Sequence, residues 1–176
     1  MDKTIVCVFG TGRAKPGDPV YALAEQIGRA LAEAGFTVAN GGYGGTMQAS
    51  AKGAAAAGGT VVGVTCSAFG SSVANEYVTR TVVTDSLDER LQNLIKAGRA
   101  YVVLPGGTGT LVELATAWEL INKGLIPQRP LACVGQFWRP VIERVLRVQN
   151  DAAEHVVFAD DAQQLSRFFP PLGGDG

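Results

Sequence analysis

The most informative stretch of this chain reads Leu104-Pro105-Gly106-Gly107-Thr108-Gly109-Thr110-Leu111-Val112-Glu113. An apolar β-type run, residues 101–104, precedes the glycines, and apolar residues at helical spacing follow them. We therefore expect a strand, a glycine turn and the start of a helix. In that arrangement backbone N–H groups and the positive end of the helix dipole point to one place, which is how proteins hold phosphate. Because Glu113 lies in the same segment, an anion-binding loop and an acid form one local unit.

Composition excludes several classes of protein. The chain has 176 residues, of which 47% are hydrophobic, and this is enough for one domain with a substantial core. Its formal net charge of -1 provides no basic field for a polyanion, so we expect no nucleic acid partner. No apolar run approaches the roughly 20 residues that span a bilayer, and the N-terminus shows no signal-peptide pattern. We therefore expect a soluble, cytoplasmic protein with no membrane partner.

The cysteines indicate neither disulfides nor a metal site. Cys7 and Cys133 lie inside apolar strand-like runs, where a buried free thiol is expected. Cys66 ends a strand and could line a site. The odd number, the wide spacing and a single histidine, His155, argue against a disulfide framework or a zinc site, so we expect no bound metal.

Strand-like and helix-like segments alternate along the chain. Strands are expected over residues 4–9, 36–39, 60–65, 77–83, 101–104, 130–134 and 156–158, and helices over residues 19–34, 47–57, 87–98, 111–121 and 138–149, with a short terminal helix. Short glycine turns join them, which predicts an α/β fold: a Rossmann-like, doubly wound, mainly parallel sheet in three α/β/α layers. We expect a single nucleotide-binding domain over residues 1–169 and a flexible tail over residues 170–176.

Two more glycine loops follow the first two predicted strands. They read Gly10-Thr11-Gly12 and Gly41-Gly42-Tyr43-Gly44-Gly45-Thr46. The dinucleotide fingerprint G-x-G-x-x-G fails because Lys15 stands at its third glycine, and the P-loop pattern G-x-x-x-x-G-K-[ST] is absent from the sequence. In parallel sheets ligands bind beyond the carboxyl ends of the strands, where all these loops fall. The pattern favours a mononucleotide or sugar-phosphate site.

Glu113 and Arg90 each have two interpretations. Thr110-x-x-Glu113 fits a capping box, in which the carboxylate would only bind the backbone at the helix start. Alternatively, Glu113 faces a ligand, because it lies roughly 200° around the helix from Leu111 at about 100° per residue. Arg90 follows a capping box at residues 86–89 and flanks an apolar stripe. It is either a snorkelling or salt-bridged residue, or a guanidinium held near a phosphate or carboxylate.

The pattern P-G-G-x-G-T-x-x-E at residues 105–113 resembles that of the LOG ("Lonely Guy") family, whose members are often labelled "lysine decarboxylase-like". The resemblance covers nearly the whole chain, including the first strand and turn and the second glycine loop with Met47. Asp88-Glu89-Arg90 resembles the family's H-E-R-K segment, with the arginine 15 residues before Pro105. The decarboxylase label has no support, since no lysine stands in a recognisable pyridoxal-phosphate setting.

The resemblance implies a nucleoside 5′-monophosphate phosphoribohydrolase. Such an enzyme cleaves the N-glycosidic bond of AMP or N6-modified AMP (a cytokinin nucleotide) and releases the free base and ribose 5-phosphate. It implies catalytic roles for Arg90 and Glu113, with Arg90 holding Glu113 ionised, no cofactor, and a homodimer or higher homo-oligomer whose interface lies near their helices. Substrate and phosphate contacts are expected from Gly10, Thr11, Gly12, Gly42, Gly44, Gly45, Thr46, Met47, Pro105, Gly106, Gly107, Thr108, Gly109 and Thr110.

Three positions depart from the LOG pattern. Leu91 replaces the lysine after the arginine, Val112 replaces the first residue of a Glu-Glu pair, and the first turn reads Gly10-Thr11-Gly12-Arg13 where the family tends to have Gly-Ser-Ser. A related group, the molybdenum-cofactor carrier proteins, shares the fold and the glycine loops but binds a pterin phosphate without cleaving a glycosidic bond. A non-catalytic nucleotide or molybdenum-cofactor carrier is therefore the alternative function.

Overall fold

The computed structural model describes residues 4–169. Within this range seven strands form one sheet in the order β4-β3-β2-β1-β5-β6-β7, and every neighbouring pair is parallel. The strands are β1 (Ile5–Phe9), β2 (Thr37–Asn40), β3 (Val61–Cys66), β4 (Arg80–Thr84), β5 (Ala100–Val103), β6 (Leu131–Val134) and β7 (Val156–Ala159). The α-helices are α1 (Pro19–Glu33), α2 (Thr46–Ala56), α3 (Leu87–Ala97), α4 (Thr108–Asn122), α5 (Arg139–Leu146) and α6 (Ala162–Leu165), and two 3-10 helices are η1 (Ser67–Phe69) and η2 (Asn150–His155).

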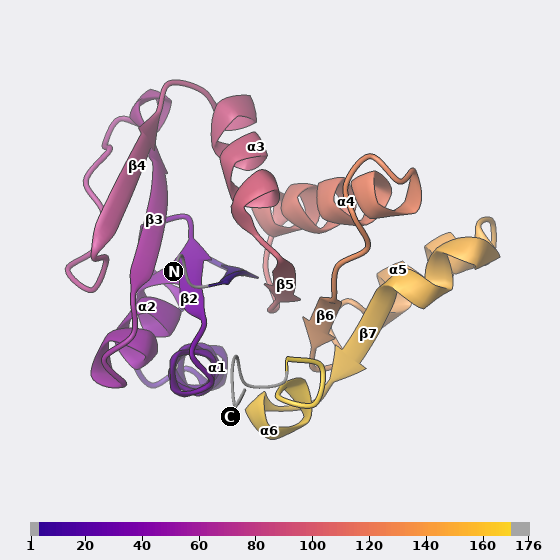
Figure 1. The fold of residues 1–176 in the computed structure, drawn as a ribbon, viewed down its shortest axis with the longest axis horizontal. Coiled ribbons are helices and arrows are strands. Elements are labelled where there is room, and N and C mark those ends of the chain that lie inside the picture. The colour runs from indigo at the N-terminus through magenta and orange to yellow at the C-terminus, as the bar shows by residue number, and fades with distance from the viewer. Residues whose placement is uncertain (1–3, 170–176) are drawn as a thin grey trace, which may run out of the picture.

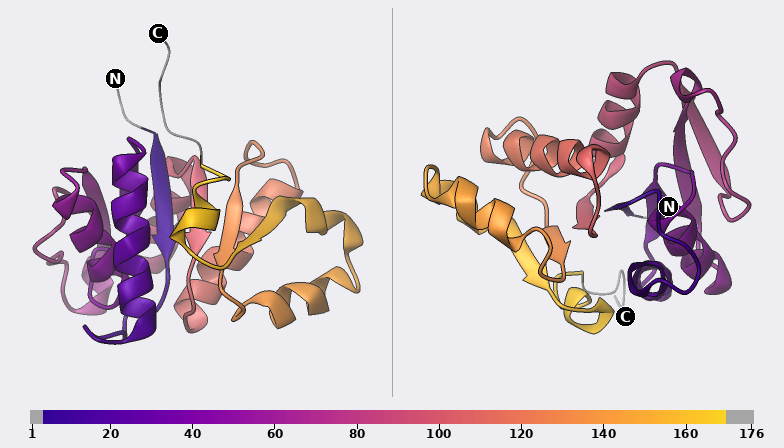
Figure 2. Two further views of the ribbon diagram at one scale, coloured as in Figure 1. Left: turned by 90° about the horizontal axis from the view of Figure 1, so that it is seen from below. Right: turned by 180° about the vertical axis from the view of Figure 1, so that it is seen from behind.

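Helices cover both faces of the sheet, which confirms the predicted three layers. Figure 1 shows α1 and α2 on one face and α3 and α4 on the other, and Figure 2 gives the same arrangement from two other sides. The side chains of β1 alternate between the layers: Val6 and Val8 join the core under α1 and α2, whereas Cys7 and Phe9 join the core under α3 and α4. Since both faces are buried, the strands read as continuous apolar runs.

Three boundaries differ from the sequence prediction by three residues, and others differ by one. β4 begins at Arg80, three residues late, because the backbone N–H of Val78 donates to Asn75 in a turn. Helix α5 ends at Leu146, and α4 begins at Thr108, directly after the glycines. The predicted tail, residues 170–176, lies outside the described residues, and the single domain over residues 1–169 stays a prediction. In the described part of the chain, none of the helices has both the length and the apolar character needed to cross a membrane.

Two glycines let α1 and α2 pack backbone against backbone. A Cβ atom added at Gly28 would overlap the backbone of Ser50, and one added at Gly53 would overlap the backbone of Glu25. An ion pair between Lys52 Nζ and Glu25 Oε2, 3.0 Å apart, bridges the same two helices. The helices that follow β1 and β2 therefore pack closely, with backbone against backbone.

The direction in which successive strands are added to the sheet reverses between β1 and β5. Strands β2, β3 and β4 follow on one side of β1, and β5, β6 and β7 extend on the other. Such a switch point is where open α/β sheets bind ligands. Here the N–H of Leu104 donates to Phe9 O at 2.8 Å, and the N–H of Thr11 donates to Pro105 O at 3.2 Å. These two bonds place the first glycine loop beside the loop of the P-G-G-x-G-T segment.

Candidate functional site

A cavity of about 930 Å³ opens at the carboxyl ends of β1, β2, β3 and β5. It is lined by the three glycine loops, by η1 and by the starts of α3 and α4. The lining residues are Val8, Phe9, Gly10, Thr11, Gly12, Arg13, Gly41, Tyr43, Met47, Phe69, Leu87, Arg90, Gly107, Thr108, Gly109, Thr110 and Glu113. The predicted location of the site, at the sheet edge where the glycine loops converge, therefore coincides with a cavity large enough for a nucleotide.

The structure divides the predicted site residues into two groups. Ten of them line the cavity: Gly10, Thr11, Gly12, Met47, Arg90, Gly107, Thr108, Gly109, Thr110 and Glu113. The other six do not line the cavity, although they lie in or next to the glycine loops that surround it. They are Gly42, Gly44, Gly45, Thr46, Pro105 and Gly106.

Several of these six residues connect the glycine loops to one another. Both the N–H and the hydroxyl of Thr46 donate to Thr11 O, at 2.9 and 3.1 Å. Gly45 has a φ of 66°, in the left-handed region that favours glycine, and a Cβ atom there would overlap Thr11 O. Pro105 O accepts a hydrogen bond from the same Thr11 residue. Thr11, in the first glycine loop, is therefore hydrogen-bonded both to the second loop and to the third.

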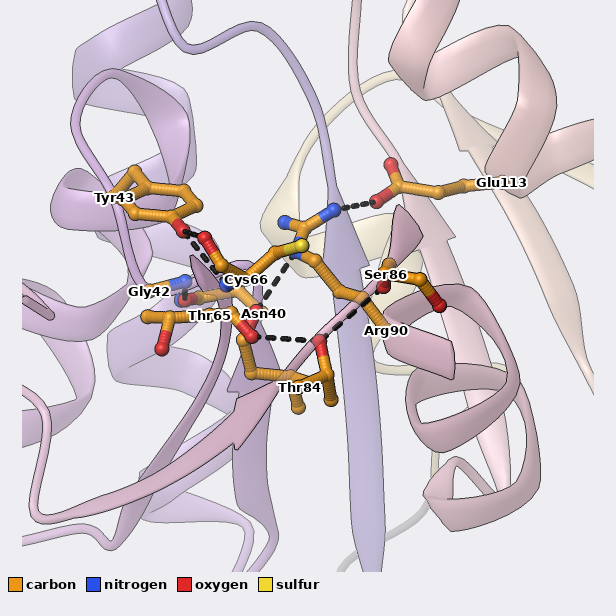
Figure 3. A network of polar contacts seen from close by, with 10 residues as sticks. Asn40, Gly42, Tyr43, Thr65, Cys66, Thr84, Ser86, Arg90 and Glu113 are labelled. Atoms are coloured by element: carbon orange, nitrogen blue, oxygen red, sulfur yellow. Dashed lines mark hydrogen bonds and ion pairs between the residues drawn. The ribbon is translucent and has the colours of Figure 1, made fainter. Parts of the chain in front are cut away.

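Arg90 is fixed in the first turn of α3. Ser86 caps this helix by accepting a hydrogen bond from the Glu89 N–H at 3.1 Å, as the capping box predicts, while Glu89 Oε2 accepts from the N–H of Asp85 at 2.9 Å. The Arg90 side chain is buried, and its Nε donates to Val64 O at 2.8 Å (Figure 3). The interpretation of Arg90 as a snorkelling residue is therefore wrong, whereas the interpretation as a salt-bridged residue held near a carboxylate agrees with its 3.6 Å ion pair with Glu113.

Glu113 and Arg90 both line the cavity and lie next to each other there. Helix α4 has Gly107 as its N-cap, so Thr110 is the third helical residue and the capping-box interpretation of Glu113 is wrong. Glu113 Oε1 lies 3.6 Å from Arg90 Nη1, and the Glu113 side chain is 13% exposed (Figure 3). Two elements that are separated by β5 in the chain therefore bring one acid and one cation to the same point.

Burial decides the protonation of Glu113. Loss of hydration raises the pKa of Glu113 from 4.5 to about 7, and the positive charge of Arg90 opposes this rise. Arg90 favours the ionised form of Glu113, as expected, because its charge lowers the pKa of that carboxyl group. Burial raises the same pKa by more, so the net shift is upward. A carboxyl group with a pKa near neutrality can both accept and donate a proton under ordinary conditions.

Gly41 makes room for the guanidinium. A Cβ atom at this position would overlap Nη2 of Arg90 and Sδ of Met47. The preceding residue, Asn40, is fully buried and organises the second loop, accepting from the N–H of Gly42 at 2.8 Å and donating to Met47 O at 2.9 Å. Sequence reasoning missed both residues, although a polar residue that ends a buried strand just before a glycine loop was a signal for Asn40.

An aromatic pair closes the other side of Arg90. The guanidinium carbon lies 5.8 Å from the centre of the Tyr43 ring and 5.7 Å from that of the Phe69 ring, and the two ring centres are 6.1 Å apart. These distances are within the range of cation–π contacts. Both aromatic residues were missed, because no periodic pattern identifies single residues of a loop and of a 3-10 turn.

The three cysteines are free and buried, as predicted for Cys7 and Cys133. Cys66, directly before η1, is also fully buried and does not line the cavity, so the expectation that it could line a site is wrong for this cavity. Among residues 4–169 the His, Cys, Asp and Glu side chains form no group of three or more that could hold a metal ion.

Relatives from two mycobacteria carry the same name. A "Cytokinin riboside 5'-monophosphate phosphoribohydrolase" from Mycobacterium marinum is 31% identical over 158 residues, which cover 78% of this chain and 84% of that protein. A protein of that name from Mycobacterium tuberculosis is 40% identical over 98 residues, which cover 54% of this chain and 52% of that protein.

One solved structure is similar over almost its whole length. The Moco carrier protein from Chlamydomonas reinhardtii superposes with a TM-score of 0.75 at 27% sequence identity, covering 94% of each chain. Similarity therefore extends both to proteins named as hydrolases and to a protein named as a carrier. Residues 3–161 match the family model of the SLOG cluster4 family, and the chain belongs to that family.

Proposed function

We propose that this protein hydrolyses the N-glycosidic bond of a nucleoside 5′-monophosphate, AMP or an N6-modified AMP, to give the free base and ribose 5-phosphate. One observation carries the proposal: the buried Arg90–Glu113 pair, 3.6 Å apart, faces the cavity where three glycine loops meet. The two mycobacterial relatives, named as phosphoribohydrolases, support the same reaction.

The phosphate is held by the third glycine loop. The first N–H groups of a helix have no partner within it, and no side chain caps those of α4. Gly107, Thr108 and Gly109 line the cavity at this helix start, so a 5′-phosphate there accepts hydrogen bonds from backbone N–H groups and meets the positive end of the dipole. The loop needs no metal ion to do this.

Glu113 acts at the ribose. Its carboxylate stabilises the positive charge that develops on the sugar as the bond to the base breaks, and it takes a proton from the attacking water. The water oxygen forms the new bond to C1′, and the electron pair of the broken bond leaves with the base. The base gains a proton from solvent to become the free base, and Glu113 returns the proton that it took to solvent. Arg90 orients the carboxylate and contacts the ribose or phosphate oxygens.

A homodimer is part of the proposal. Leu111 and Val112 on α4 are 40% and 44% exposed, and Leu87 on α3 is 48% exposed. These apolar side chains lie on the two helices that carry Glu113 and Arg90, and Leu87 also lines the cavity. Association of two copies through α3 and α4 would remove them from water.

The second candidate is a non-catalytic carrier of a pterin phosphate or nucleotide. The similarity to the Chlamydomonas carrier favours it, as does the chemistry of two positions. Leu91 packs against the apolar core under α3, and Val112 is exposed on α4, where the LOG pattern has a lysine and a glutamate.

Chromatography of reaction mixtures separates the two functions. The purified protein is incubated with AMP, GMP, CMP, UMP and isopentenyl-AMP, beside Glu113→Gln, Arg90→Ala and a control, Glu119→Gln. Glu119 lies on the same helix and is 56% exposed, so its variant should keep full turnover. Free base released by wild type and control but not by the two site variants is the expected result. Intact nucleotides throughout, or full turnover by both site variants, would exclude this mechanism.

A further inference from the structure

We infer that Phe69, held in place by Tyr43, is the surface on which the planar base of the ligand stacks. This inference rests on the proposed function for the identity of the ligand as a nucleotide. It assigns a recognition role to residues that lie outside the three glycine motifs and the Arg90–Glu113 pair.

The order of strands gives the cavity two chemically different ends. Along the sheet edge β3, β2, β1 and β5 follow one another. The β5 end carries the N-terminus of α4, with Gly107 and Thr108 in the lining, and the β3 end carries Phe69. Three inter-strand steps of about 4.8 Å separate these ends by roughly 14 Å, which suits a nucleotide laid along the edge. A phosphate at the β5 end therefore directs the base to the β3 end.

The reacting bond falls between these ends. In a nucleoside monophosphate the ribose joins the phosphate to the base, so the glycosidic bond lies on the base side of the sugar. Arg90 and Glu113 reach into the cavity from α3 and α4, and Arg90 contacts both Glu113 and the aromatic pair. The order phosphate loop, carboxylate, arginine, aromatic rings matches the order of groups along the ligand.

Phe69 combines exposure with a place in the cavity lining. It is 50% exposed although it lines the cavity, so much of a large apolar ring remains open to a ligand. Aromatic faces of this kind stack bases with little dependence on base identity. Stacking would cover the ring from one side, while the Arg90 guanidinium lies 5.7 Å from its centre.

Tyr43 is the positioning residue for Phe69. Its hydroxyl accepts a hydrogen bond from the Cys66 N–H at 2.8 Å, and lies 3.1 Å from Cys66 O and 3.0 Å from Ser71 O, either of which can accept its proton. Cys66 and Ser71 flank η1 on both sides (Figure 3 shows the contact to Cys66). One hydroxyl therefore fixes both ends of the turn that carries Phe69.

Calorimetric titration with two ligands tests the assignment. AMP and ribose 5-phosphate are titrated into a Glu113→Gln background, which prevents turnover, with Phe69→Ala, Phe69→Tyr or Tyr43→Phe added. Ribose 5-phosphate has the sugar and the phosphate of AMP but no base. Phe137→Ala is the matched control, because Phe137 is 53% exposed and packs edge-to-face against Trp138 outside the cavity lining.

The expected result is selective. Phe69→Ala should weaken AMP binding roughly tenfold or more, the usual effect of removing a base-stacking ring, and leave ribose 5-phosphate binding unchanged. Phe69→Tyr should retain AMP affinity, Tyr43→Phe should lose part of it, and Phe137→Ala should change neither ligand.

Two outcomes would overturn the assignment. Equal losses for AMP and ribose 5-phosphate in Phe69→Ala would mean that the ring acts only through Arg90, and unchanged binding of both would mean that the base lies elsewhere. Hydrolysis is measured separately with the wild-type protein. Selective loss of AMP binding without any hydrolysis by wild type would retain the base-stacking surface and exclude the hydrolase.

Discussion

Replacing Glu113 by glutamine should remove a pH-dependent loss of stability that reaches about 3 kcal/mol in the wild type at pH 8. A buried carboxyl group is costly to ionise, and burial raises the pKa of Glu113 from 4.5 to about 7. Each tenfold change in proton affinity corresponds to about 1.4 kcal/mol, so this rise amounts to about 3 kcal/mol. The Glu113 side chain is only 13% exposed, so solvent screens little of this cost.

The effect has a defined direction with pH. Below pH 4.5 the carboxyl group is protonated in both the folded and the unfolded chain. Between pH 4.5 and about 7 it is ionised only in the unfolded chain, so its contribution to the free energy of unfolding falls as the pH rises. Above pH 7 it is ionised in both states and the loss is complete. Glutamine stays neutral and shows no such fall.

Urea unfolding at a fixed protein concentration between pH 4 and pH 9 measures the effect. The quantity of interest is the free energy of unfolding of Glu113→Gln minus that of wild type, which should rise from its acid value by about 3 kcal/mol between pH 4 and pH 8. The control Glu119→Gln should give a flat difference. If the Glu113→Gln difference is also flat, or falls with pH, pairing with Arg90 outweighs burial and the reasoning is refuted.

Four further outcomes are expected. Gly41→Ala should displace the guanidinium that packs against it and lower kcat at least a hundredfold, since misplaced catalytic groups cost about this much, while the circular dichroism spectrum stays native. The kcat/KM of wild type should rise with pH through a midpoint near 7, because the ionised form of Glu113 is the base; a flat profile from pH 5 to 9 would contradict that role. Trp138→Phe removes the 2.9 Å hydrogen bond to Leu104 O and should lower the free energy of unfolding by about 1–3 kcal/mol in urea titrations. Val112→Arg should convert a dimer into a monomer in light scattering, and an unchanged mass would place the interface elsewhere.

Most of the fold could be predicted because its signals are local. Runs of β-branched residues and helical periodicity each occupy one segment, and glycines end them, so a strand or helix was expected at each of the observed main elements. The strand order was beyond such reasoning. It places η1 at one end of the cavity and α4 at the other, and it depends on how distant segments pair.

The candidate site could be predicted only in part. The resemblance to the LOG pattern singled out Arg90 and Glu113, but local patterns also allowed a capping role for one and a surface role for the other. The choice depended on the packing of α3 against α4, which no local pattern encodes. Phe69 was missed for a related reason. An exposed aromatic residue in a 3-10 turn indicates a binding surface only once its neighbour Tyr43 is known, and Tyr43 follows a different strand.

The close contact of α1 and α2 has a consequence for how a ligand is received. With Gly28 and Gly53 at the crossing, the two helices pack backbone against backbone, and the hydrogen bonds from Thr46 to Thr11 tie the first two glycine loops to this packed pair. These loops therefore lose their conformational entropy when the chain folds and not when the ligand arrives. A ligand meets this half of the cavity already formed, so its association should be limited by diffusion and steering, without a slow rearrangement of the loops.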